Sequence, residues 1–465
     1  MPATGPLEKI RAAMVRRTTL PADVCRRLLV VVVLLGAGVA GAGGDLRSAV
    51  GGAPRWTRIG VEATRPPGRA QFGMAIDGTG SLYVYGGHGD AGFLDDFWRY
   101  DSAHGWKQLA NPVVPPLVEP HLAADAAGDI FEFGGIGDHQ QGPHLSPDGH
   151  SYGLYEYVPA TGMWLDLTRG DAQPGLGWPQ GREDHGFAYD RATGMFYLFA
   201  GEGQGNVNLD DMWRYDERAG NWVQIAQRGS GSGLPDAREI YNISTDGQGG
   251  IYLFGGAYLY DAQHRRVPWT YTNDLWRFDI GSATWHALAG TPNAYDPSMP
   301  MPRHYYGQAC DGQGNFYILG GYVSDVKDPP YFSDDASQDY AQLEVFHTSD
   351  VPTGNLFFAL ADFWQYNAAQ HRWIDRSGNL GDMQGKPFIP YAMVADPAGS
   401  RLITFGGYYP DGNDLLQTGA ELRAYPLPAM GIASGGTPIT ATPRPAARVP
   451  GSAPFPTTTP LPGRR

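Results

Sequence analysis

The chain has 465 residues and a formal net charge of −14 at pH 7, from 48 acidic and 34 basic side chains. Both termini are basic, so the residues between them are more acidic than this total. This charge argues against nucleic acid or an anionic membrane surface as a partner, because both are negatively charged themselves. Of the two cysteines, Cys25 lies in the N-terminal leader and only Cys310 in the repetitive part, which excludes a disulfide framework there.

The first 42 residues resemble an export signal. Residues 1–27 contain six basic and two acidic side chains, and the uncharged run 28–42 closes with Ala40-Gly41-Ala42. A basic segment, a short apolar run and an A-x-A spacing are typical of a secretory signal peptide. The run is shorter than the about 20 residues that span a bilayer. An uncleaved signal-anchor is the alternative, because 27 residues are long for the basic segment. We expect a secreted or extracytoplasmic protein, or one anchored by this segment.

After a short linker at 43–54, the chain repeats itself. Hydrophobic runs ending in glycine recur at Leu82–Gly87, Ile130–Gly135, Met195–Gly201, Ile251–Gly256, Phe316–Gly321 and Leu402–Gly407. Each run marks one repeat, and each repeat predicts four short strands, which we name a to d. Strands a and b are apolar, and strands c and d are aromatic. The residues expected to hold the repeats together are Trp98, Trp213, Trp276 and Trp364 in strand c, and the pairs Gly86, Gly87, Gly255, Gly256, Gly320, Gly321, Gly406 and Gly407 after strand b.

A period of roughly 50 residues with four strands per unit is the signature of a propeller blade. The glycine pairs, the strand-c pattern D-x-W-R-Y-D and the strand-d tryptophan resemble the kelch motif. This resemblance covers about residues 55–430 and implies an all-β fold, a kelch-type β-propeller of four-stranded blades.

Six blades account for every predicted strand. The sixth unit has no tryptophan strand after it, whereas one such strand, Arg55–Ile59, precedes the first unit. If that strand supplies d of the last blade, the ring closes without an unpaired edge. The predicted blades are 66–111, 115–170, 178–229, 235–291, 300–377 and 386–425, the last completed by 55–61. Residues 431–465 are rich in Pro and Thr and predict a disordered tail.

The loops that join strand b to strand c vary most in length. The second blade has the loop Ile136–Tyr152, and the fifth has Tyr322–Ala361, about 40 residues with many acidic side chains. Variable loops on a rigid scaffold commonly carry binding function. The b–c loops and the d–a connections emerge on the same face of a four-stranded meander, and we expect the functional site on that face.

An arginine begins strand a in four repeats. These side chains either pair with acidic or carbonyl groups within each blade, or form a ring that holds a carboxylate or acidic peptide. Polar and aromatic neighbours at the same positions suit a sugar or a peptide. The candidate binding residues are Arg69, Arg182, His185, Arg238, Tyr241, Arg303, His304, Tyr306 and Tyr391.

Three further kinds of site have weaker support. The second-blade loop contains Asp138, His139, His144, Asp148 and His150, but no metal-binding spacing is met. Some kelch propellers resemble copper-radical sugar oxidases, which need a cysteine cross-linked to a tyrosine; no second motif supports Cys310 in that role. A kelch-type sugar-acid isomerase would use an Arg/His/Glu cluster such as Arg182, Glu183, His185, Arg238, Glu239 and Arg303.

We therefore predict no catalytic residues, no metal and no cofactor. The expected function is a secreted or surface scaffold that binds an extracellular protein or a glycan through its b–c/d–a face. A monomer is expected. The isomerase, or another carbohydrate-active enzyme, is the alternative.

Overall fold

Regular structure in this computed structural model is almost entirely β, which confirms the all-β prediction. The structure describes residues 53–111, 113–137, 142–172, 174–226, 234–240, 242–260, 266–290, 296, 298–325, 344–346, 356–410 and 416–427. The predicted leader and tail and most of the fifth-blade insertion lie outside this set. Within it, the helical elements are the 3-10 turns η2 (Ser377–Asn379) and η3 (Gly381–Met383). No helix among these residues is long and apolar enough to cross a membrane.

The described residues form six four-stranded antiparallel sheets, which we number in chain order. The first contains β2 (Gly73–Ile76), β3 (Leu82–Tyr85), β6 (Phe97–Asp101) and β7 (Gly105–Leu109); the second, β9 (His121–Ala124), β10 (Ile130–Phe133), β12 (Leu154–Val158) and β13 (Met163–Asp166); the third, β15 (Gly186–Asp190), β16 (Met195–Phe199), β19 (Met212–Asp216) and β20 (Asn221–Ala226). The fourth contains β21 (Ser244–Thr245), β22 (Gly250–Tyr260), β23 (Arg266–Asp279) and β24 (Thr284–Ala289); the fifth, β25 (Gly307–Cys310), β26 (Asn315–Leu319), β30 (Phe363–Asn367) and β31 (Arg372–Asp375); the sixth, β32 (Met393–Ala395), β33 (Arg401–Phe405), β36 (Leu422–Pro426) and β1 (Thr57–Ile59). Each sheet runs a-b-c-d, as a meander requires.

Shorter strands next to the repeated glycines form five small separate sheets. They are β4 (His88–Gly89) with β5 (Gly92–Phe93); β8 (Leu117–Val118) with β11 (Ile136–Gly137); β14 (Arg182–Glu183), β17 (Glu202–Gly203) and β18 (Val207–Asn208); β27 (Tyr322–Asp325), β29 (Leu356–Ala359) and β28 (Glu344–Phe346); and β34 (Tyr408–Pro410) with β35 (Leu416–Thr418). In the fourth sheet the long strands β22 and β23 continue past the glycines, and their pairing shifts register between Phe254 and Gly256.

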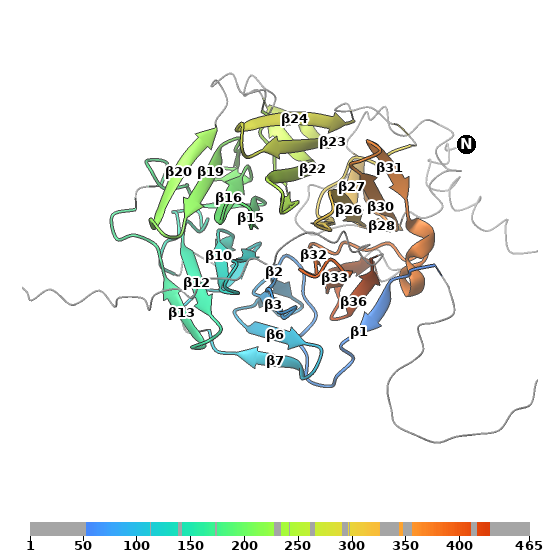
Figure 1. Ribbon diagram of the computed structural model, residues 1–465, viewed down its shortest axis with the longest axis horizontal. Helices are drawn as coiled ribbons and strands as arrows, with labels where there is room; N and C mark the ends of the chain where they lie inside the picture. The colour runs from blue at the N-terminus through green and yellow to red at the C-terminus, as the bar shows by residue number, and fades with distance from the viewer. Residues whose placement is uncertain are drawn as a thin grey trace, which may run out of the picture. The chain divides into compact units, whose positions relative to one another are not determined.

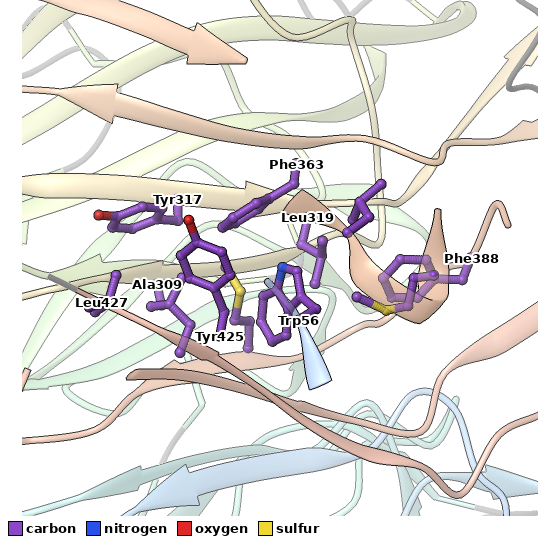
Figure 2. Packing of buried hydrophobic residues seen from close by; sticks show 12 residues of the cluster. Trp56, Ala309, Tyr317, Leu319, Phe363, Phe388, Tyr425 and Leu427 are labelled. Atoms are coloured by element: carbon purple, nitrogen blue, oxygen red, sulfur yellow. The ribbon is translucent and has the colours of Figure 1, made fainter. Parts of the chain in front are cut away.

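The sixth sheet takes its outer strand from the beginning of the described chain. β1 pairs antiparallel with β36, with Thr57 opposite Ala424 and Ile59 opposite Leu422. Just before β1, the Trp56 ring is buried among Phe363 and Tyr425, with ring centroids 5.6 Å apart in each pair (Figure 2). Burying a large aromatic side chain contributes about 2–3 kcal/mol, so Trp56 fixes β1 on this edge.

Hydrophobic clusters join each sheet to the next, and the sixth to the first. The strands a also contact one another in the cyclic order β2, β9, β15, β21, β25, β32, β2. Figure 1 shows the sheets following one another in chain order, with the labelled strands a, β2, β15 and β32, on the inner side. At least one aromatic pair joins every two neighbouring sheets. The following pairs have ring centroids 4.3 to 5.3 Å apart: Phe97/Trp164, Phe131/Phe196, Phe199/Trp285, Phe254/Trp373, Phe363/Tyr425 and Trp106/Phe405. Such ring pairs add to the stabilisation from buried area.

The glycine pairs have a steric role. Both glycines of each expected pair adopt positive φ, for example 63° at Gly86 and 90° at Gly87. A Cβ at Gly87 would lie 2.5 Å from the Ala70 carbonyl oxygen. The backbone therefore passes the start of strand a at a distance that only glycine allows.

The strand-c tryptophans bind the aspartate two residues earlier. Each indole Nε1 donates a hydrogen bond of 2.6 to 2.9 Å to that carboxylate, in the pairs Trp98/Asp96, Trp213/Asp211, Trp276/Asp274 and Trp364/Asp362. The same aspartates reappear below as the partners of the repeated arginines.

Candidate functional site

Six short stretches, which we name the rim segments, lead into strand a of the six sheets: 69–72, 117–120, 182–185, 238–240, 303–306 and 388–391. The second residue of each pairs with the residue after the glycines of its own sheet, in Ala70↔His88, Val118↔Ile136, Glu183↔Glu202, Glu239↔Ala257, His304↔Tyr322 and Ile389↔Tyr408. Rim segments also bond to each other. The Glu119 amide donates to the Gln71 carbonyl (2.7 Å), and the Ile240 amide donates to the Asp184 carbonyl (2.8 Å). Side chains from different sheets therefore gather at this end of the strands a.

The four arginines of the rim segments point into their own sheets. Arg238 donates to both oxygens of Asp274 (2.7 and 3.0 Å) and to the Gly255 carbonyl oxygen (3.0 Å). The same bidentate pairing, at 2.6 to 2.9 Å, joins Arg69 to Asp96, Arg182 to Asp211 and Arg303 to Asp362. All four arginines are fully buried. This geometry corrects the hypothesis of a guanidinium ring for a ligand carboxylate, because each guanidinium is enclosed and already paired within its blade.

Two other candidate residues also lie inside the fold, and one cannot be assessed. The buried His185 ring packs against His121, at 4.3 Å between centroids, and against Phe133. The buried Tyr306 hydroxyl donates to the Phe254 carbonyl oxygen. Both side chains fill space between neighbouring sheets and offer no surface to a ligand. Tyr241 lies outside the described residues.

His304 and Tyr391 belong to an aromatic group at the rim. Tyr305 stacks on His304 with centroids 4.0 Å apart, and its ring lies 4.8 Å from that of Tyr391 and 5.5 Å from that of Tyr322. Tyr408 continues the group beyond Tyr391, at 5.7 Å. Tyr305, Tyr322 and Tyr408 are half-buried, so their exposed parts line one side of the rim.

Carboxylates line the other side. We name Glu119, Glu183, Asp184, Glu202 and Glu239 the carboxylate cluster; all but Glu183 are buried. Glu119 accepts a hydrogen bond from the Gln71 side-chain amide (2.6 Å), and Asp184 accepts one from the Tyr305 hydroxyl (3.0 Å). Glu239 accepts one from the Asn208 side-chain amide (3.0 Å). Three sheets thus contribute acidic groups to one small volume.

Crowding changes how these acids ionise. Burial and the neighbouring Glu183 raise the pKa of Glu119 to about 7. Burial, followed by the charges of Glu119 and Glu239, raises the pKa of Asp184 well above its ordinary value. Burial and a hydrogen bond with Glu202 raise the pKa of Glu239 in the same way. Burial and crowding therefore oppose the ionisation of these carboxyl groups, and a cation beside them would favour their charged forms.

His150 from the second-sheet loop forms an ion network at the edge of the cluster. Burial opposes its charge, but Glu183 and Asp148 more than offset this and raise the pKa of His150 to about 9. Its Nδ1 lies 3.0 Å from Asp148 and its Nε2 lies 3.5 Å from Glu183. Of the other loop residues considered for metal binding, His144 pairs with Asp166 at 2.8 Å, whereas Asp138 and His139 lie outside the described residues.

Glu119 and Glu202 were not among the residues predicted from the sequence. Glu119 stands two residues after Leu117, at the position that Asp184 occupies two residues after Arg182. Glu202 follows the Ala200-Gly201 pair, at the position that Tyr322 occupies after its glycines. Aligning the repeats on their glycines and comparing these two positions would have found the cluster.

A cavity of about 250 Å³ opens at the opposite end of the strands a. Small and apolar side chains such as Ala75 and Ala309 line its wall, and the turns at Asp246, Asp311 and Asp396 form its edge. This end carries the a–b turns, away from the predicted functional face. Its lining contains no histidine.

The described residues form no assembled site for either of the two enzymes considered, the copper-radical sugar oxidase and the sugar-acid isomerase. The buried Cys310 thiol donates to the Ser244 carbonyl oxygen (3.7 Å) within the fold, and burial raises its pKa. Of the six residues considered for an isomerase, Glu183 and Glu239 lie in the carboxylate cluster. The other four, the three arginines and His185, are enclosed within or between sheets.

Known proteins resemble this chain over most of the described part. Residues 52–329 match the family described as the Attractin/LZTR1 beta-propeller. A leucine-zipper-like transcriptional regulator 1 homolog from Drosophila melanogaster is 26% identical over 67% of this chain and 30% of its own length. Kelch domain-containing protein 10 from Homo sapiens is 24% identical over 73% of this chain and 66% of its own length. Kelch domain-containing protein 3 from Rattus norvegicus is 26% identical over 43% of this chain and 51% of its own length.

This chain therefore spans about a third of the first relative and just under two thirds of the second. The kelch resemblance drawn from the glycine pairs and the D-x-W pattern is confirmed by these matches. The chain is a kelch-type propeller and belongs to the attractin/LZTR1 β-propeller family.

Proposed function

We propose that this protein is a protein-binding scaffold whose partner docks on the rim segments. The observation that carries the proposal is the gathering of five acidic and several tyrosine side chains from different sheets at one end of the strands a. Two of the relatives that match most of the chain are named for their kelch domains, and aromatic groups beside charged ones are typical of protein-binding surfaces.

In this proposal the six sheets are six blades of a closed propeller. The cyclic contacts of the strands a, the hydrophobic cluster between sixth and first sheets, and the pairing of β1 with β36 support it. A closed ring of such sheets leaves only short sheet edges for another chain to pair with, which favours recognition by side chains at the rim. The protein is accordingly proposed to be a monomer.

The partner segment is positively charged. The carboxylate cluster offers Glu183 as its most exposed member, with a side chain 19% exposed. Tyrosine faces next to it attract a guanidinium or ammonium group as well. A ring of accessible arginines would have bound an acidic partner. Because the arginines are enclosed and carboxylates line one side of the rim, the proposed partner is basic.

The basic leader and apolar run suggest that docking takes place outside the cytoplasm. The proposed partner is accordingly an extracellular or surface protein. A glycan bearing amino groups is the alternative ligand, since tyrosine faces stack on sugar rings as well as on peptide groups.

Peptides of matched length and opposite charge test the proposal. Fluorescein-labelled Arg/Lys-rich, Glu/Asp-rich and neutral peptides are titrated against the purified protein by fluorescence polarisation. We expect basic peptides to bind best, and added salt to weaken binding by screening. Glu183→Gln should weaken binding about 10-fold, the effect of losing one partly buried ion pair.

Asp279→Asn is the matched control, because it removes one carboxylate charge in a c–d turn at the other end of the fourth sheet. It should leave binding unchanged. Preferential binding of acidic peptides, equal effects of the two substitutions, or turnover of sialic acids by the purified protein would each overturn the proposal.

A further inference from the structure

His304 is a buried histidine without a hydrogen-bond partner for either ring nitrogen within the described part of the chain. Its Nε2 faces Asp184 Oδ1 across 4.0 Å. That oxygen is buried and lacks a hydrogen bond too. Leaving a buried polar atom unsatisfied costs about 1–3 kcal/mol. Two such atoms aimed at each other, too far apart to bond directly, leave room for a third group between them.

Glu239 completes a set of three ligands. One atom each from Asp184, Glu239 and His304 lies within 4.8 Å of the other two. A metal ion lies about 2.1 Å from an imidazole nitrogen or a carboxylate oxygen, so two of its ligands are at most about 4.2 Å apart. Side-chain shifts of less than about 1 Å would therefore bring all three atoms to bonding distance of one ion.

We propose that Asp184, Glu239 and His304 bind a divalent transition-metal ion that links the third, fourth and fifth sheets at the rim. An imidazole beside two carboxylates suits Zn²⁺ or Mn²⁺, whereas Ca²⁺ prefers a shell made entirely of oxygen. The ion would also neutralise the two carboxylates, whose mutual repulsion is otherwise uncompensated at this place.

Neighbouring groups already orient the three ligands. The second oxygen of Asp184 is held by the Tyr305 hydroxyl, and Glu239 is held by the Asn208 amide, at 3.0 Å in both cases. The His304 ring is fixed by stacking on Tyr305. Such outer contacts are what a metal site needs to keep its geometry.

A second group, His150, Glu183 and Glu202, has similar spacing but is less suitable. His150 Nδ1 already pairs with Asp148 at 3.0 Å, and its other nitrogen faces Glu183 at 3.5 Å. A histidine held between two carboxylates is stabilised as a cation, which cannot coordinate a metal. This difference selects the His304 group.

Calorimetric titration of the chelator-treated protein with Zn²⁺, Mn²⁺ or Ca²⁺ tests the proposal, with the thermal unfolding midpoint measured in parallel. We expect one equivalent of Zn²⁺ or Mn²⁺ to bind and to raise the midpoint, and Ca²⁺ to bind at least about 10-fold more weakly. Asp184→Asn and Glu239→Gln should each weaken binding roughly 10- to 100-fold. Asparagine is chosen because it tolerates the φ of 48° at position 184.

Both substitutions remove a buried charge, so the metal-free variants should be at least as stable as the metal-free parent, and their folding is checked by circular dichroism. His150→Gln, which removes the imidazole of the second group, is the control and should leave the affinity unchanged. A protein that binds no transition metal, or one whose binding survives both Asp184→Asn and Glu239→Gln, overturns the proposal. Binding lost in His150→Gln alone would place the ion in the second group and overturn it as well.

Discussion

Replacing Arg238 with methionine should destabilise the protein more than the same change at any other repeated arginine. Methionine keeps the apolar stem but removes the guanidinium, which leaves the carboxylate of Asp274 without its cationic partner. Asp274 is the least accessible of the four aspartates, with a side chain 3% exposed, against 13% for Asp211 and 20% for Asp362. Breaking a buried pair costs about 3–5 kcal/mol, and the cost falls where water reaches the remaining charge.

We therefore expect Arg238→Met to lower the free energy of unfolding by about 3–5 kcal/mol and Arg303→Met by less, as measured by urea denaturation at 25 °C. The double variant with Asp274→Leu should recover much of the loss, because no buried charge remains. Burial raises the pKa of Asp274, but Arg238 outweighs it and the net pKa is lowered. The pair therefore stabilises the protein above about pH 4, the ordinary aspartate pKa, and this contribution disappears as the pH falls through the lowered value. A loss below 1 kcal/mol, or a larger loss in Arg303→Met, would refute this reasoning.

Three further predictions concern stability. Glu132 is buried with neither oxygen hydrogen-bonded in the described residues, and burial raises its pKa well above the ordinary value. The free energy of unfolding of the parent therefore falls as the pH rises and Glu132 is forced to ionise in its buried place. Glu132→Gln should gain stability over the parent above about pH 4.5, by up to about 1.4 kcal/mol per pH unit. The exposed control Glu62→Gln should show no such trend in urea melts at several pH values. Trp56→Ala should cost about 3–5 kcal/mol in the same assay, and an unchanged midpoint would mean that β1 does not hold the sixth sheet. Gly87→Ala should destabilise far more than Gly80→Ala, because both have positive φ but a Cβ at Gly80 would meet nothing within 4 Å; equal thermal midpoints would contradict the steric account.

Features that repeat were predictable from the sequence, and pairing of the arginines within each blade was one of the two alternatives that it offered. Strand positions follow from alternation, and the glycine pairs follow from their recurrence. The repeats that begin with an arginine also contain D-x-W. The second repeat has Leu117 in place of the arginine and Gly153 in place of the aspartate, so it lacks both partners. Two residue types that appear and disappear together are partners in space. That rule would have favoured pairing within each blade over a ring for a ligand.

The carboxylate cluster was less predictable because it depends on side-chain direction at an irregular backbone. Gln71, Glu119, Asp184 and Tyr305 share one position in their repeats, and all four adopt a positive φ between 48° and 58°. Non-glycine residues rarely adopt such angles, and neither propensity nor alternation indicates where their side chains then point. The pKa changes likewise depend on groups from three sheets, which no single repeat contains.

Function in this fold is best sought where equivalent positions carry different residues. The side chains of the repeated arginine, aspartate and tryptophan serve their own sheet, and the amide of the last repeated glycine donates to the rim segment of the next sheet. These contacts are therefore the same in each copy that carries them. The next two rim positions read Ala-Gln, Val-Glu, Glu-Asp, Glu-Ile and His-Tyr in the first five repeats, although the backbone brings them to the same place. An asymmetric ligand needs an asymmetric surface, and a ring of near-identical sheets can supply one only through such divergent positions. The acidic and tyrosine sides of the rim arise in this way, as does the single place where His304 meets two carboxylates.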